Sequence, residues 1–164
     1  TYGEERMPHA AGVVEHAVDT GRLIDELSGR APQQTGLDAA YGGSRPFPIL
    51  RHGMLFGEHP SVGRQLPQPT IDGRPLDDLL GTGFAIVVDD SSVAADIDRR
   101  WAELARIVEV PLGSMPMTLP AGGAVIVRPD RYVAAVAHDA DELATASTAL
   151  LAHLSAPTTE GPSA

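Results

Sequence analysis

The residues best placed for chemistry follow an apolar run, residues 84–88, whose pattern predicts a strand buried on both faces. The next four residues are Asp89, Asp90, Ser91 and Ser92. A carboxylate can act as a general acid or base, and a serine can act as a nucleophile when a histidine activates it. Neither serine lies in a Gly-x-Ser-x-Gly setting or beside a histidine in the sequence. We interpret the serines as helix caps and predict no catalytic residue here.

Two further acidic groups have structural explanations. Asp77 and Asp78 lie in the first turn of a predicted short helix, where negative charge favours the helix dipole. Asp139, Asp141 and Glu142 lie at the start of the last predicted helix, where carboxylates cap backbone N–H groups. Acid–base catalysis needs a carboxylate with a perturbed pKa in a cleft, and these patterns do not indicate one. We predict that both groups are structural.

The spacing of the histidines does not indicate a metal site. None belongs to a His-Glu-x-x-His motif or to a pair four residues apart. His52 and His59 flank the segment MLFGE and are the first candidates for any histidine function. We predict solvated or turn histidines and no metal-binding residue. The six histidines are His9, His16, His52, His59, His138 and His153.

The absence of cysteine removes several kinds of chemistry. Without it the chain has no disulfide, no thiolate metal site and no thiol redox reaction. The sequence also lacks a Gly-x-Gly-x-x-Gly motif and a Walker loop, so we predict no cofactor-binding residue. The single tryptophan, Trp101, is more typical of a core residue than of a stacking platform.

Composition narrows the choice of partners and location. The chain of 164 residues carries a formal net charge of -10, and its 12 basic residues are all arginine. Such a surface repels nucleic-acid phosphates and anionic lipids, so we expect neither nucleic acid nor membrane as a partner. No apolar run approaches the roughly 18 residues that span a bilayer, and the N-terminus lacks a signal-peptide core. We therefore expect a cytoplasmic protein.

Residues 1–28 are predicted to form one helix that Thr1 and Glu4 cap. The sequence has no initiator methionine, and this helix has nothing upstream to pack against, so we expect a fragment of something longer. Its apolar stripe needs a cover, which we expect from the sheet domain or from a second copy in a homodimer. The stripe contains Met7, Val14, Val18, Ile24 and Leu27.

Residues 29–68 are rich in proline and glycine, which predicts a long, extended connection. A short strand is predicted at residues 69–71, followed by a turn at Asp72-Gly73. A short helix then has Pro75 at its first position and Gly81 as its stop. Residues 156–164 are polar and are predicted to be a disordered tail.

Residues 69–155 read as a domain with a recognisable order of elements. The strand 84–88 precedes a helix that Ser91 or Ser92 caps, with Val93, Ile97, Trp101 and Leu104 on one side, and a strand at 107–110. Strands at 124–127 and 132–137, joined through Pro129-Asp130, form an antiparallel hairpin. A last helix begins after Asp139, which Glu142 complements in a capping box. Its apolar face comprises Leu143, Ser147, Leu150, Leu151 and Leu154.

This order predicts an α/β fold with a mixed four-stranded sheet flanked by helices, which is the thioredoxin-like arrangement. Redox enzymes with this fold place a nucleophilic cysteine just after the first central strand. Asp89 and Asp90 occupy that position here, so disulfide exchange and thiol peroxidase chemistry are excluded.

Three segments resemble parts of the flavoprotein aromatic hydroxylases. Residues 1–10, TYGEERMPHA, are similar to the segment that closes the FAD-binding domain of these enzymes. Residues 63–87, GRQLPQPTIDGRPLDDLLGTGFAIV, resemble the start of the C-terminal domain of the 3-(3-hydroxyphenyl)propionate hydroxylase type. Residues 123–135, GAVIVRPDRYVAA, resemble the Val-Arg-Pro-Asp-x-Tyr-Val-Ala hairpin of that domain. In the first segment the matching places are filled by Thr1, Tyr2, Glu5, Arg6 and Pro8.

The resemblance implies a thioredoxin-like C-terminal domain without redox cysteines, serving stability, domain packing or assembly. The FAD-binding motifs would lie upstream of Thr1, in a domain that would be this module's partner. The resemblance therefore assigns no catalytic, cofactor-binding or metal residue to this chain. The intact parent would hydroxylate a phenolic compound with FAD, NAD(P)H and oxygen, and the fragment alone would have no turnover.

Two other interpretations stay open on the sequence. The chain could be a stand-alone, redox-inactive thioredoxin-fold protein that binds partners through its proline-rich segment. The segment IDGRPLDDL, residues 71–79, also suggests a cysteine-free relative of the peroxiredoxins.

Overall fold

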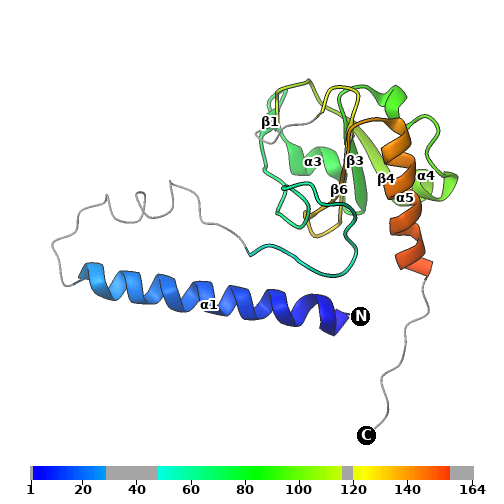
Figure 1. Ribbon diagram of the computed structural model, residues 1–164. Helices are drawn as coiled ribbons and strands as arrows, with labels where there is room; N and C mark the ends of the chain where they lie inside the picture. Colours follow the sequence, from blue (N-terminus) through cyan, green and yellow to red (C-terminus); the bar gives the residue numbers. More distant parts are fainter. Residues whose placement is uncertain (1, 29–47, 116–119, 156–164) are drawn as a thin grey trace, which may run out of the picture.

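A computed structural model describes residues 2–28, 48–115 and 120–155 (Figure 1). Helix α1 (Tyr2–Ser28) confirms the predicted N-terminal helix and lies beside the module formed by the other elements. In the described parts of the chain, no helix combines the length and apolar character needed to cross a bilayer. The predictions for Thr1, for residues 29–47 and for the tail at 156–164 fall outside the described residues. The domain boundaries stay a prediction.

The module is built on the predicted mixed four-stranded sheet. Its order is β4-β3-β5-β6. Strand β3 pairs in parallel with β4 and antiparallel with β5, and β5 pairs antiparallel with β6. The predicted parallel crossover and antiparallel hairpin are therefore both confirmed. The strands are β3 (Phe84–Val88), β4 (Ala105–Glu109), β5 (Ala124–Val127) and β6 (Val133–Ala137).

Both faces of this sheet are covered, which explains why β3 and β5 are apolar without alternation. Val87 packs in a cluster with Leu76 and Leu80 of α3 (Leu76–Leu80). Ile86 points to the other face and packs in a cluster with Trp101 and Leu143. The second face lies under α4 (Arg99–Leu104) and α5 (Ala140–Ser155).

The predicted helix that Ser91 or Ser92 would cap is wrong in its extent and in its cap. The chain instead forms a 3-10 turn, η1 (Ser91–Ala94), and then the short helix α4. Asp90 caps the first by accepting a hydrogen bond from Ser92 N at 2.8 Å, and Asp98 caps the second by accepting from Arg100 N at 2.8 Å. An aspartate side chain that bonds nearby backbone groups competes with a continuous helix. As a result Trp101 is fully buried, whereas Leu104 is 45% exposed.

Helix α5 confirms the predicted cap but differs in two details. Asp139 Oδ1 accepts a hydrogen bond from Glu142 N at 2.8 Å, as expected of an N-terminal cap. The Glu142 carboxylate accepts from His138 N, one residue earlier than the capping box predicts. Leu154, predicted on the apolar face, is 47% exposed because the helix extends beyond the sheet at that end.

The predicted small hairpin and short helix precede the sheet. Strands β1 (Thr70–Ile71) and β2 (Arg74–Pro75) pair antiparallel. Helix α3 follows with Pro75 at its cap position, not inside its first turn, and ends at Gly81, whose φ of 74° favours glycine.

The outer edge of β6 is covered by residues 56–66, part of the predicted extended connection. Phe56 N donates to Ala134 O at 2.8 Å, and Gly63 N donates to Val133 O at 2.9 Å. Gly63 has a φ of 75°, and a Cβ there would overlap the Leu50 carbonyl, so this position requires glycine. The connection therefore satisfies the backbone groups of an edge strand.

Candidate functional site

The acidic residues after β3 bind backbone groups. The Asp89 carboxylate accepts a hydrogen bond from Gly122 N at 3.0 Å. The hydrogen bonds from Ser92 lower the pKa of Asp90. Glu109 of the neighbouring strand accepts from Ser91 N at 3.2 Å. These carboxylates therefore stabilise the turns at one end of the sheet by accepting backbone hydrogen bonds. Redox enzymes of this fold carry their cysteine at that end.

The other sequence candidates are dispersed over the module. Asp77 pairs with Arg131, and the hydrogen bonds from His138 lower the pKa of Glu142. His59 lies against His138 with ring centroids 6.1 Å apart, whereas His52 is exposed. Within residues 2–28, 48–115 and 120–155, no group of three or more metal-ligand side chains could hold a metal ion.

The charged cluster with the least solvent exposure joins α1 to the turn between β5 and β6. Arg128, with a side chain only 9% exposed, lies at its centre. Its guanidinium donates to both oxygens of Glu5, at 2.5 and 3.1 Å, and to both oxygens of Asp130, at 3.0 Å each. Arg6 of α1 donates to Asp130 at 2.7 Å. We call these four residues the junction.

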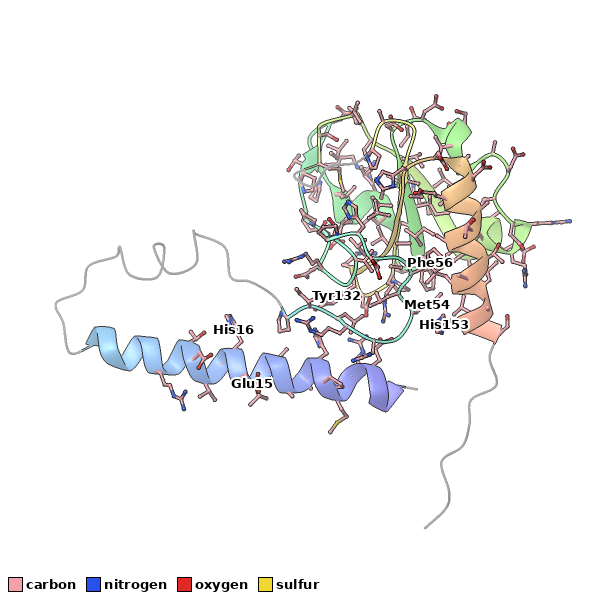
Figure 2. All side chains as sticks on the ribbon, in the orientation of Figure 1. Glu15, His16, Met54, Phe56, Tyr132 and His153 are labelled. Atoms are coloured by element: carbon pink, nitrogen blue, oxygen red, sulfur yellow. The ribbon has the colours of Figure 1, made fainter. Side chains whose placement is uncertain are left out.

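Further hydrogen bonds surround the junction. His9 Nε2 lies 2.8 Å from the Tyr132 hydroxyl, and the two rings meet edge to face. Met54 N donates to Glu5 at 3.3 Å and ties the preceding connection to the same carboxylate. Figure 2 shows Tyr132 on the side of the module that faces α1, with His16 turned toward the module and Glu15 turned away from it.

Side-chain periodicity in α1 explains which face meets the module. A helix places residues three and four positions apart on one side. The half-buried positions of α1 follow this spacing, and a Cβ at Gly12 would contact Pro48 at 3.5 Å. The side of α1 that faces the module is therefore mostly polar. It carries Glu5, His9, Gly12, His16 and Thr20.

The junction shifts the pKa values of its acids downward. The hydrogen bond from Arg128 is the main cause of the lowered pKa of Glu5 and outweighs the opposing effect of burial. Burial is the largest single effect on the pKa of Asp130, and it raises that pKa. The hydrogen bonds and charges of Arg128 and Arg6 together outweigh burial, so the pKa of Asp130 is lowered. Both carboxylates are therefore ionised at neutral pH and stabilise the docked helix.

The groove beside α5 does not fit the diphosphate of FAD. A groove of about 470 Å³ lies between residues 56–59 and α5, but Glu58, Asp141 and Glu142 line it and would repel a diphosphate. Helix N-termini bind phosphate through free backbone N–H groups. At η1 and α5 one of these N–H groups bonds to the carboxylate of Asp90 and of Asp139, respectively.

The comparison with protein families shows which family this chain belongs to. A family model described as aromatic-ring hydroxylase, C-terminal, matches residues 59–157, which is more than half of the chain. The chain belongs to this family. The match contains the sheet, α5 and the hairpin half of the junction, and α1 lies before it.

Longer proteins carry this hydroxylase C-terminal domain. A relative from Burkholderia cenocepacia (strain HI2424), named 3-(3-hydroxy-phenyl)propionate/3-hydroxycinnamic acid hydroxylase, is 31% identical over 185 aligned residues. The alignment covers 82% of this chain but 34% of that relative. The chain therefore spans about a third of the length of the curated relative it matches.

Solved structures show the same fold for the hydroxylase C-terminal domain and for α1. RebC with bound 7-carboxy-K252c superposes with a TM-score of 0.62 at 21% identity, covering 92% of this chain and 36% of RebC. A ternary complex of aklavinone-11 hydroxylase with FAD and aklavinone gives 0.57 at 20% identity, covering 93% of this chain and 35% of that protein. A protein that shares this fold has therefore been solved with FAD bound.

The sequence pattern alone did not indicate the junction, although all four of its residues lie in the two segments that resemble the hydroxylases at residues 1–10 and 123–135. Glu5 and Arg6 belong to the segment that resembles the end of an FAD-binding domain, and Arg128 and Asp130 belong to the resembling hairpin. The available signal was charge complementarity, because residues 1–10 hold two acids and one arginine and residues 123–135 hold two arginines and one acid.

Proposed function

We propose that this chain is the non-catalytic C-terminal portion of an FAD-dependent phenolic monooxygenase. Its role is structural, because the junction holds α1 in a fixed orientation against the thioredoxin-like module. The observation that carries the proposal is the bidentate contact of Arg128 with Glu5, reinforced by Arg6 and Asp130. Two of the three segments that resemble the hydroxylases, residues 1–10 and 123–135, thus each supply half of a single ion-pair cluster.

The parent's chemistry would reside outside this chain. In the upstream domain, FAD would use NAD(P)H and molecular oxygen to hydroxylate a phenolic ring. The name of the Burkholderia relative supports a phenolic substrate, and the FAD complex of aklavinone-11 hydroxylase supports the cofactor. The carboxylates of Asp90 and Asp139, which cap η1 and α5, support a module in which the flavin binds to the upstream domain.

Reading the coding DNA upstream of Thr1 tests the proposal. We expect an in-frame region that encodes a glycine-rich dinucleotide-binding motif. A start codon immediately before Thr1 would contradict the proposal and favour a stand-alone binding protein with the same fold.

A further inference from the structure

The groove beside α5 plays no part in the proposed function. Its volume of about 470 Å³ falls within the range of about 300–1,000 Å³ that small-molecule sites occupy in proteins. One wall is formed by residues 56–59 of the connection, and the other by residues 141–146 in the first turns of α5. Val136 of β6 and His138, just after that strand, complete the lining.

Part of the groove is apolar. Phe56 from the connection, Val136 from β6 and Ala146 from α5 supply carbon surface. Phe56, labelled in Figure 2, is 37% exposed, although phenylalanine is usually buried. Its backbone N–H donates to Ala134 O, so the connection holds this ring at the groove. The groove therefore offers apolar contact, including one aromatic ring, to the body of a ligand.

The charges of the groove are negative and unbalanced. Its lining includes three carboxylates, those of Glu58, Asp141 and Glu142, and no arginine is among the described residues that line it. Glu142 already accepts hydrogen bonds from the backbone and the ring of His138. Across residues 2–28, 48–115 and 120–155, the carboxylates of Glu58 and Asp141 have no hydrogen-bond or ion-pair partner. Two carboxylates at the groove are therefore available to a cation.

This combination of charge and apolar surface is complementary to an organic cation. The carboxylates attract a positive group, the apolar residues contact a carbon body, and an aromatic ring adds a cation–π attraction. We infer that the groove beside α5 binds a small organic cation, namely a primary ammonium or guanidinium group on an apolar body. The inference does not rest on the proposed function, because every residue that it uses lies in the described module.

The sheet edge beside the groove favours a small molecule over an extended peptide. Peptides often bind by adding a strand to an open sheet edge. Here the outer edge of β6 is already paired with the connection, through the N–H groups of Phe56 and Gly63. A small molecule needs no backbone pairing, so it fits the groove without displacing residues 56–66.

Titration of the 164-residue chain with 2-phenylethylammonium tests the site. Binding is followed through the backbone amide resonances at pH 7.5, above the ordinary pKa of histidine. The control ligand is 2-phenylethanol, which has nearly the same size and shape but no charge. We expect the amides of Gly57 and Thr145 to shift, with a Kd on the order of 1 mM for the cation and at least about tenfold larger for the alcohol.

Matched substitutions separate the groove from the net charge of the chain. Asp141→Asn and Asp78→Asn each remove an exposed carboxylate from the first turn of a helix, but α3 and α5 pack on opposite faces of the sheet. We expect Asp141→Asn to bind the cation about threefold more weakly and Asp78→Asn to bind it like the wild type. Glu58→Gln is expected to show the same loss, with Glu103→Gln, exposed in α4, as its unchanged control.

The comparison of the two ligands on the wild type needs no variant, so it stands even if a substitution impairs folding. Equal Kd values for the cation and the alcohol would overturn the inference. Equal losses in Asp141→Asn and Asp78→Asn would also overturn it, because they would show a response to net charge alone. Neither result bears on the proposed function, which the upstream coding region tests.

Discussion

Replacing Arg128 with methionine is expected to lower the free energy of unfolding of the 164-residue chain by about 2–3 kcal/mol and to release α1 from the module. Arg128 bridges Glu5 and Asp130, whose side chains are 15% and 25% exposed. Methionine keeps much of the apolar stem but leaves the two carboxylates with Arg6 as the cation that still contacts them. We place the effect below that of a fully buried pair, because both acids keep some contact with water.

Urea denaturation followed by far-ultraviolet circular dichroism measures this loss. The matched control is Arg100→Met, which breaks the exposed ion pair with Asp98. We expect that control to leave the denaturation midpoint unchanged, since exposed pairs contribute little. Equal midpoints for wild type and Arg128→Met would show that the junction does not hold α1.

Acidification is expected to reproduce the effect of Arg128→Met in the wild type. The ordinary pKa values of Glu5 and Asp130, 4.5 and 3.8, are both lowered in the folded chain. The stability from such groups is fully present above the ordinary pKa and is lost as the pH falls through the lowered pKa. Wild-type stability is thus expected to fall below about pH 4.5 more steeply than that of Arg128→Met.

Replacing Trp101 with alanine is expected to cost about 4 kcal/mol, the largest single loss in the sheet module. Trp101 is fully buried, its indole N–H donates to Ser147 O at 2.7 Å, and its ring meets Phe84 edge to face at 5.3 Å. Alanine leaves a cavity between α4, α5 and the sheet and removes the partner of a buried carbonyl.

Denaturation of two further variants separates packing from the hydrogen bond. Trp101→Phe keeps most of the ring volume but loses the bond to Ser147, and we expect a cost of about 1–2 kcal/mol. Leu104→Ala, in the same helix but 45% exposed, is expected to change stability by less than about 1 kcal/mol. A cost below about 1 kcal/mol for Trp101→Ala would show that this core cluster is wrongly described.

The sheet could be predicted because its strands carry a strong local signal. The runs at Phe84–Val88 and Ala124–Val127 are apolar throughout, and Pro129-Asp130 leaves only a tight turn between the last two strands. Burial on both faces produces that pattern directly, so the strand positions and the mixed topology follow.

Two kinds of feature were harder to predict: helix ends that depend on competition between side-chain and backbone hydrogen bonds, and contacts between residues far apart in the sequence. Asp98 ends one possible helix and begins another because its side chain reaches the backbone of Arg100, and a periodic apolar pattern does not report this contact. The junction joins residues 123 positions apart, Glu5 and Arg128, and no local pattern encodes such a pairing. The sequence indicates an apolar stripe on α1, but only the structure shows that Met7, Val14 and Val18 of that stripe are exposed to solvent.

The visible absorption spectrum of the purified 164-residue chain tests the central claim most directly. The chain is incubated with equimolar FAD and then desalted, so that only tightly bound flavin remains. We predict a spectrum without flavin bands, because the N-termini of η1 and α5 and the groove beside α5 present carboxylates to a diphosphate. Retention of one FAD per chain would contradict the account.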